Sequence, residues 1–148
     1  MLFENRIEGP VHGVEMWTTW QPTSALRLSG GVTAFRKHLR LEPGSTDPVG
    51  INNPQLANDP GHQWMLRTSF NVRPAHDADF LIRHVGALPN PAVPGYVTGD
   101  VRYAWRLGPE LELALKALDI FEGHSEFGGT TTRSRFERSV LFQVIWAR

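Results

Sequence analysis

Strict alternation of apolar and polar side chains over residues 96–118 constrains the fold more than any other feature of this sequence. Successive side chains of a β-strand point to opposite faces, so a period of two residues predicts a strand with two different faces. The apolar positions are Val97, Gly99, Val101, Tyr103 and Trp105, and the other face carries Thr98, Asp100, Arg102 and Ala104. Turn-forming residues follow at 107–110 and alternation resumes at Leu111, so this segment is predicted to be a β-hairpin.

The same alternation recurs along the chain and predicts an all-β fold. In addition to the hairpin, strands are expected at residues 11–20, 26–40, 62–72, 79–85 and 136–146, with a short further candidate at 2–7. We expect residues 1–148 to form a single domain, an antiparallel up-and-down meander of 7–8 strands.

The connections between the expected strands alternate between short and long. Short turns are expected at residues 21–25, 73–77 and 107–110, and long loops at 42–61, 86–95 and 121–135. A meander places all the short turns at one end and all the long loops at the other, as in outer-membrane barrels. The pattern therefore favours a sheet that is part of a transmembrane β-barrel.

Aromatic residues near the strand ends point the same way. Amphipathic rings gather at both interfaces of a membrane and form two girdles around a barrel. The predicted girdle residues are Trp20, Phe70, Trp105 and Trp146 at the short-turn end and Trp64 and Tyr96 at the long-loop end. Aromatic residues also occur at strand ends in soluble β-proteins, so this pattern alone leaves both classes open.

A set of polar and charged residues falls on the face opposite the apolar one. In a barrel these side chains are expected to face the lumen, because arginine facing lipid at mid-bilayer costs about 2–4 kcal/mol. The alternative is cross-strand ion pairing, for example between Asp100 and an adjacent arginine. The set comprises Glu15, Arg27, Arg67, Arg83, Asp100, Arg102, Glu112, Lys116 and Gln143.

Composition excludes several other functions. Fifteen basic and fifteen acidic residues cancel, so no global field favours nucleic acid, and the absence of cysteine excludes disulfides and thiolate metal sites. The six histidines are scattered, and no cofactor, metal site or enzymatic step is expected. His124 and Glu126, in an expected loop, are the only candidates for contact with a ligand. No apolar run approaches a membrane-spanning helix, and no signal peptide is recognisable at the N-terminus.

Several segments, in order, resemble the C-terminal β-barrel portion of TonB-dependent outer-membrane receptors. One is the strand and turn that ends in Trp-Gln-Pro-Thr at residues 20–23. The similar segments are Gly13–Thr23, Leu26–Thr33, Asp59–Gln63, Leu66–Phe70, Arg83–Pro89, Val93–Trp105, His124–Gly128 and Arg138–Trp146. The chain departs from the family at residues 117–122 and at Arg148, where the family usually ends in phenylalanine.

The resemblance implies a function in transport. Family members are 22-stranded barrels, plugged by an N-terminal domain, that import siderophores and similar nutrients. This chain would supply the last seven or eight strands in the cell outer membrane and is not expected to transport alone. Its partners would be membrane lipid, the missing N-terminal barrel and plug and, through the plug, an inner-membrane energy-coupling complex. A truncated gene, a fragment and an intact protein all stay open.

A second hypothesis keeps the strands but exchanges the two faces. A soluble up-and-down β-barrel would turn its apolar side chains inward and bind a small apolar ligand there. Its charged side chains would then face water.

Overall fold

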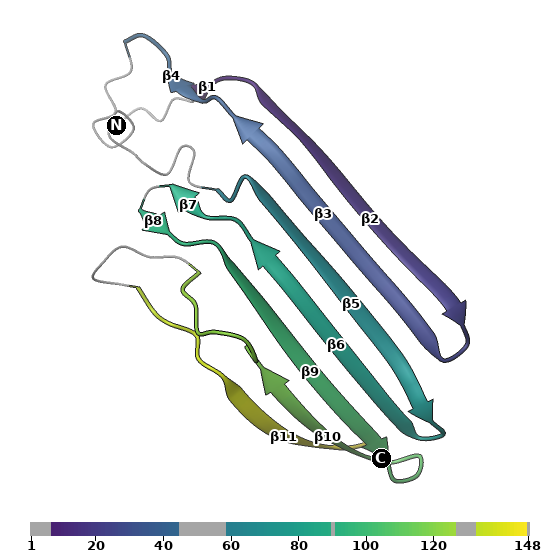
Figure 1. The fold of residues 1–148 in the computed structure, drawn as a ribbon. Coiled ribbons are helices and arrows are strands. Elements are labelled where there is room, and N and C mark those ends of the chain that lie inside the picture. The colour runs from purple at the N-terminus through teal and green to yellow at the C-terminus, as the bar shows by residue number, and fades with distance from the viewer. Residues whose placement is uncertain (1–6, 45–58, 90, 127–132, 148) are drawn as a thin grey trace.

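A computed structural model describes residues 7–44, 59–89, 91–126 and 133–147, and this part of the chain consists of strands and turns without a helix (Figure 1). Seven long strands form one sheet. They are β2 (Val11–Thr23), β3 (Leu26–Lys37), β5 (His62–Arg73), β6 (His76–Val85), β9 (Tyr96–Arg106), β10 (Leu111–Leu118) and β11 (Ser139–Trp146).

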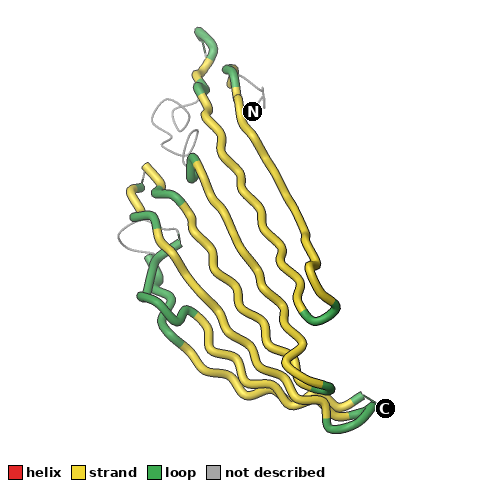
Figure 2. The backbone as a smooth tube through the Cα atoms, turned by 45° about the vertical axis from the view of Figure 1, so that its right-hand side comes forward, coloured by secondary structure: helices red, strands yellow, loops and turns green. Residues whose placement is uncertain are grey.

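Each long strand pairs antiparallel with the next long strand in sequence, and the sheet order is β11-β10-β9-β6-β5-β3-β2. The predicted all-β, antiparallel up-and-down meander is therefore confirmed. The described sheet is not closed: β2 and β11 lie at its two edges, and Figure 2 shows a single layer of strands.

The short and long connections lie at opposite ends of the sheet, as predicted (Figure 1). Two small ribbons occur at the long-loop end, one formed by β1 (Ile7–Glu8) with β4 (Arg40–Leu41) and the other by β7 (Leu88–Pro89) with β8 (Ala92–Val93). The expected loop at 86–95 therefore contains the second ribbon. Residues 45–58 and 127–132 of the other two expected loops lie outside the described residues.

Most differences from the predicted strands are at their ends. The expected strand at 2–7 lies outside the described residues except for Ile7, which begins β1. Strand β2 continues to Thr23 through a register irregularity after Trp20. The Thr23 hydroxyl accepts a hydrogen bond from the backbone N–H of Leu26 (3.1 Å), which makes the turn tighter than expected.

Two further strand boundaries also differ from the prediction. Strand β6 begins three residues earlier than expected, since a turn with Ala75 at a φ of 67° precedes it. Strand β11 begins at Ser139, because Phe136 instead forms an isolated bridge with His124.

The cross-strand register divides the sheet into two faces, and along β9 burial on these faces is opposite to that of a soluble sheet. On the apolar face, Val101 is 37% exposed and Trp105 is 43% exposed. On the other face, called here the charged face, Thr98 is 4% exposed and Ala104 is fully buried. The small core therefore lies on the charged face, where Ala104 and Ala114 oppose each other.

Within the described ranges, no helix is long and apolar enough to span a membrane.

Candidate functional site

All nine predicted lumen-facing positions lie on the charged face. Residues directly opposite each other on neighbouring strands lie on the same face of the sheet. The register pairs Glu15 with Thr33 and Arg27 with Ser69, and following it from strand to strand puts all nine positions on one face. The full set is Glu15, Arg27, Arg67, Arg83, Asp100, Arg102, Glu112, Lys116 and Gln143. Whether this face lines a lumen stays a prediction.

An ion-pair network occupies the middle of the charged face. Arg102 donates to Asp79, which lies directly opposite on β6 (Nη1 to Oδ2, 3.2 Å), and to Glu112 on β10. Asp79 also accepts hydrogen bonds from Ser69 (2.7 Å) and Arg67 (3.3 Å) on β5. The network thus joins four neighbouring strands through charged side chains, which matches the ion-pairing interpretation of this face.

The expected partner of Asp100 was wrong. Arg102, two residues along the same strand, pairs with Asp79 and Glu112, whereas Asp100 accepts a hydrogen bond from the backbone N–H of Asp119 (3.0 Å). The reason is the register, which puts Leu81, not a basic residue, opposite Asp100. Asp79 was the first residue of the strand expected at 79–85 and was not assigned to either face, so it is missing from the predicted lumen-facing set; the structure starts the strand at His76 and places Asp79 within the sheet.

Five of the six predicted girdle aromatics lie on the apolar face near strand ends: Trp20, Trp64, Phe70, Trp105 and Trp146. Tyr96 does not. Tyr96 lies on the same face of β9 as Thr98 and Asp100, which is the charged face. Its hydroxyl donates a hydrogen bond to Glu126 (3.0 Å). The girdle assignment is therefore wrong for Tyr96 and stays a prediction for the other five.

Trp17 is the one tryptophan of the five that lies on the charged face, and the sequence analysis did not single it out. Its indole covers Gly31 on the neighbouring strand, where an added Cβ would overlap the ring. Only glycine at that position leaves room for this packing.

At the long-loop end, Glu126 joins three segments of the chain. Its Oε1 accepts hydrogen bonds from Arg83 of β6 (2.8 Å) and Tyr96 of β9 (3.0 Å), and it lies 3.3 Å from Nε2 of His124. Burial acts to raise the pKa of Glu126, but the hydrogen bonds from His124 and Tyr96 and the charge of Arg83 outweigh burial and hold the pKa below its ordinary value.

The segment between β10 and Glu126 is also anchored to β9. The backbone N–H of Ile120 donates to the carbonyl of Gly99 (2.9 Å), and the Thr98 hydroxyl donates to the carboxylate of Asp119. Asp119 has a φ of 52°, a left-handed conformation that turns the chain away from the ladder. We call residues 119–126 the anchored loop.

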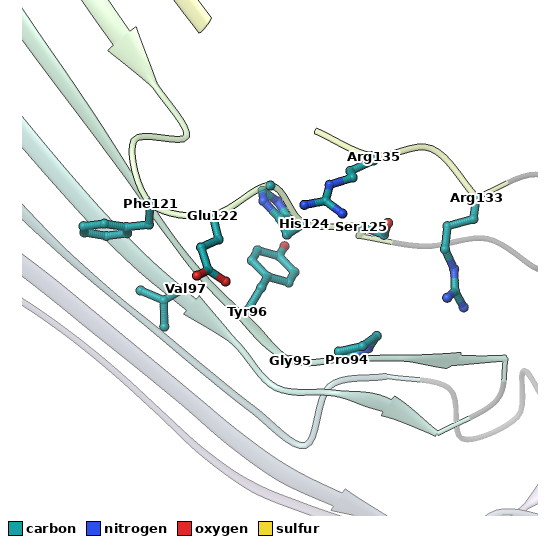
Figure 3. Close-up of a pocket in the computed structure, with 11 residues that line it drawn as sticks. Pro94, Gly95, Tyr96, Val97, Phe121, Glu122, His124, Ser125, Arg133 and Arg135 are labelled. Carbon is teal, nitrogen blue, oxygen red and sulfur yellow. The ribbon is translucent and has the colours of Figure 1, made fainter. Parts of the chain in front are cut away.

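A pocket of about 830 Å³ opens where β9 extends beyond the end of β10. Figure 3 shows that its walls come from the start of β9, the anchored loop and the segment before β11. The lining residues are Pro94, Gly95, Tyr96, Val97, Phe121, Glu122, Gly123, His124, Ser125, Arg133 and Arg135.

The two predicted ligand-contact residues differ in their relation to this pocket. His124 lines it, whereas Glu126 does not, because its carboxylate lies among Arg83, Tyr96 and His124. The two pocket arginines also have partners: Arg133 donates to the carbonyl of Ala92, and Arg135 forms an ion pair with Glu137 (2.9 Å).

Histidines far apart in sequence meet on the apolar face. The rings of His62 and His84 stack with centroids 5.1 Å apart, and His84 also stacks on Trp64. The sequence spacing did not predict this contact, which depends on strand register. In the part of the chain that the structure describes, no group of three or more His, Cys, Asp or Glu side chains could hold a metal ion.

No family model matches this chain, and no curated protein matches it either.

Proposed function

We propose that this chain is the C-terminal barrel portion of a TonB-dependent outer-membrane receptor. The observation that carries the proposal is the inverted burial of the sheet. Large apolar side chains such as Val101, Phe142 and Trp146 are exposed on one face, while the charged residues around Asp79 and Arg102 pair on the more buried face. An exposed apolar face of this size requires an apolar partner, and lipid is the partner that a membrane barrel provides.

Strand length and connectivity support the same function. The longer strands, β2 to β9 in the sheet, contain 10 to 13 residues, enough for a tilted strand to cross a bilayer. All the long connections lie at one end, which in outer-membrane barrels is the extracellular end. In this proposal the pocket beside the anchored loop faces the outside, where a siderophore-type nutrient would first be met.

The proposed role is transport, without an enzymatic step. The chain would supply seven strands of a larger barrel, and the missing N-terminal strands would pair with the open edges at β2 and β11. A plug domain would contact the charged face and connect it to the inner-membrane energy-coupling complex. The soluble-barrel alternative is not favoured. A soluble barrel needs its apolar side chains on the enclosed face, whereas here the apolar face is the exposed one.

Lipid-borne quenchers test the orientation of the sheet. We would prepare five variants of the full chain, each retaining one tryptophan and carrying phenylalanine at the other four positions, in vesicles that contain brominated lipid. Quenching is expected for Trp20, Trp64, Trp105 and Trp146 on the apolar face. Trp17 is the matched control, since it lies on the charged face and should be quenched much less.

Two results would contradict the proposal. One is equal quenching of Trp17 and Trp20, which lie on opposite faces of the same strand. The other is a chain that is monodisperse in plain buffer and stays out of the membrane fraction, because an exposed apolar face would then have no need of lipid.

A further inference from the structure

The imidazole of His124 is buried and held in one orientation. Its side chain is only 5% exposed. The ring stacks on Tyr96 with centroids 4.0 Å apart and has Phe136 at 5.5 Å. The backbone of His124 also exchanges two hydrogen bonds with that of Phe136 (3.1 and 2.8 Å). The ring therefore has little freedom to turn toward other partners.

Each ring nitrogen of His124 faces a carboxylate. Nε2 lies 3.3 Å from Oε1 of Glu126, and Nδ1 lies 3.8 Å from Oδ1 of Asp119. Nδ1 is buried and has no hydrogen-bond partner among the described residues. A neutral imidazole has one N–H group and one lone pair, so it can donate to only one of the two carboxylates.

Charged and titratable groups from the anchored loop, β6, β9 and the segment before β11 surround His124. Glu126 and Asp119 flank the ring within the anchored loop, and Glu122 lines the same pocket. Two arginines oppose them: Arg83 from β6 contacts Glu126, and Arg135 lies against Gly123 while pairing with Glu137. From β9, Tyr96 stacks on the ring, Thr98 donates to Asp119, and Asp100 binds the backbone of Asp119.

We propose that His124 is a proton switch for the anchored loop. Uptake of one proton gives Nδ1 a hydrogen that points toward Asp119, so the imidazolium bridges Asp119 and Glu126 and holds the loop more tightly against the start of β9. Because His124 lines the pocket, tightening of the loop also changes the wall of the pocket. This inference does not depend on the proposed transport function.

Amide hydrogen exchange of the full chain, in the medium that keeps it folded, tests the switch. Two reporter amides belong to the anchored loop: Ile120 donates to Gly99, and His124 donates to Phe136. After correction for intrinsic rates, we expect their protection to rise at least about tenfold from pH 7.5 to pH 5.5, as for one added hydrogen bond between charged groups. The amide of Ala147, at the other end of the sheet, should not change.

Two variants separate the switch from a general effect of pH. His124→Phe keeps a stacking ring but cannot titrate, and Asp119→Asn keeps an acceptor for Thr98 and tolerates the φ of 52° while removing the negative charge. Both variants should abolish most of the rise in protection. If His124→Phe does not fold, Asp119→Asn and the wild-type chain decide the question. A flat pH response in the wild-type chain, or an equal rise in Asp119→Asn, would overturn the proposal.

Discussion

Placing one arginine on either face of the sheet measures whether the apolar face contacts lipid. Val101 lies at the midpoint of β9 on the apolar face, between Phe80 and Ala117 in the register. The nearest strand end is five residues away, about 17 Å along the strand, which is farther than an arginine side chain reaches. The charge would therefore stay within the bilayer, at a cost of about 2–4 kcal/mol. That cost corresponds to a loss of about 30- to 700-fold in the folding equilibrium.

Leu81→Arg is the matched control. Leu81 lies at nearly the same level as Val101 but on the charged face, between Asp100 and Arg67. We expect it to cost at most about 1 kcal/mol, because attraction to Asp100 on one side offsets repulsion from Arg67 on the other. The assay is the folded fraction of the full chain in phosphatidylcholine vesicles over a urea series. Equal costs for the two variants, or a larger cost for Leu81→Arg, would refute the assigned orientation.

Three further predictions concern the ion-pair network, the anchored loop and one turn. Asp79→Asn should destabilise the fold by about 1–3 kcal/mol in denaturant unfolding, because its carboxylate has three partners. Asp77→Asn removes a carboxylate that pairs with Arg106 alone and should cost less than about 1 kcal/mol; equal costs would contradict the importance of the network. Because the pKa of Glu126 is lowered on folding, its stabilisation is present above the ordinary carboxyl pKa of about 4.3 and is lost as the pH falls through the lower folded value. Proteolysis of the anchored loop should therefore accelerate below about pH 4.3, and Glu126→Gln should remove this acceleration; an unchanged acceleration in the variant would contradict the prediction. Gly108 has a φ of 107°, so Gly108→Ala should lower the free energy of unfolding by about 1 kcal/mol. Gly30→Ala is the control and should cost less, because the added Cβ meets only ordinary van der Waals contacts. A lower urea midpoint for Gly30→Ala than for Gly108→Ala would be inconsistent with backbone strain at Gly108.

Much of the sheet could be predicted because its determinants are local. Alternation with a period of two assigns each strand residue to a face, and turn residues such as Gly108 and Pro109 mark where strands end. For this reason the faces of all nine charged-face residues and the positions of the turns could be assigned from the sequence. Tyr96 was assigned to the girdle because it lies at a strand end. The alternation along the strand puts it on the same face as Asp100, away from the apolar face, and that assignment is the correct one.

The candidate site was harder to predict because it depends on register and loop geometry. Nothing in the sequence indicates that Arg83, Tyr96 and Glu126 meet at one carboxylate oxygen, since they come from two strands and a loop. The left-handed conformation of Asp119 decides where the anchored loop crosses β9. Such contacts follow from tertiary packing, which local periodicity does not specify.

The meander also has a consequence for the order in which the chain folds. Tight turns join β2 to β3, β5 to β6 and β9 to β10, so three hairpins can form from residues close in sequence. Strand β11 has no such local partner, because a long connection separates it from β10. Closing that connection costs chain entropy before any pairing is gained. We therefore expect the three hairpins to form first and β11 to dock last, completing the sheet from its C-terminal edge.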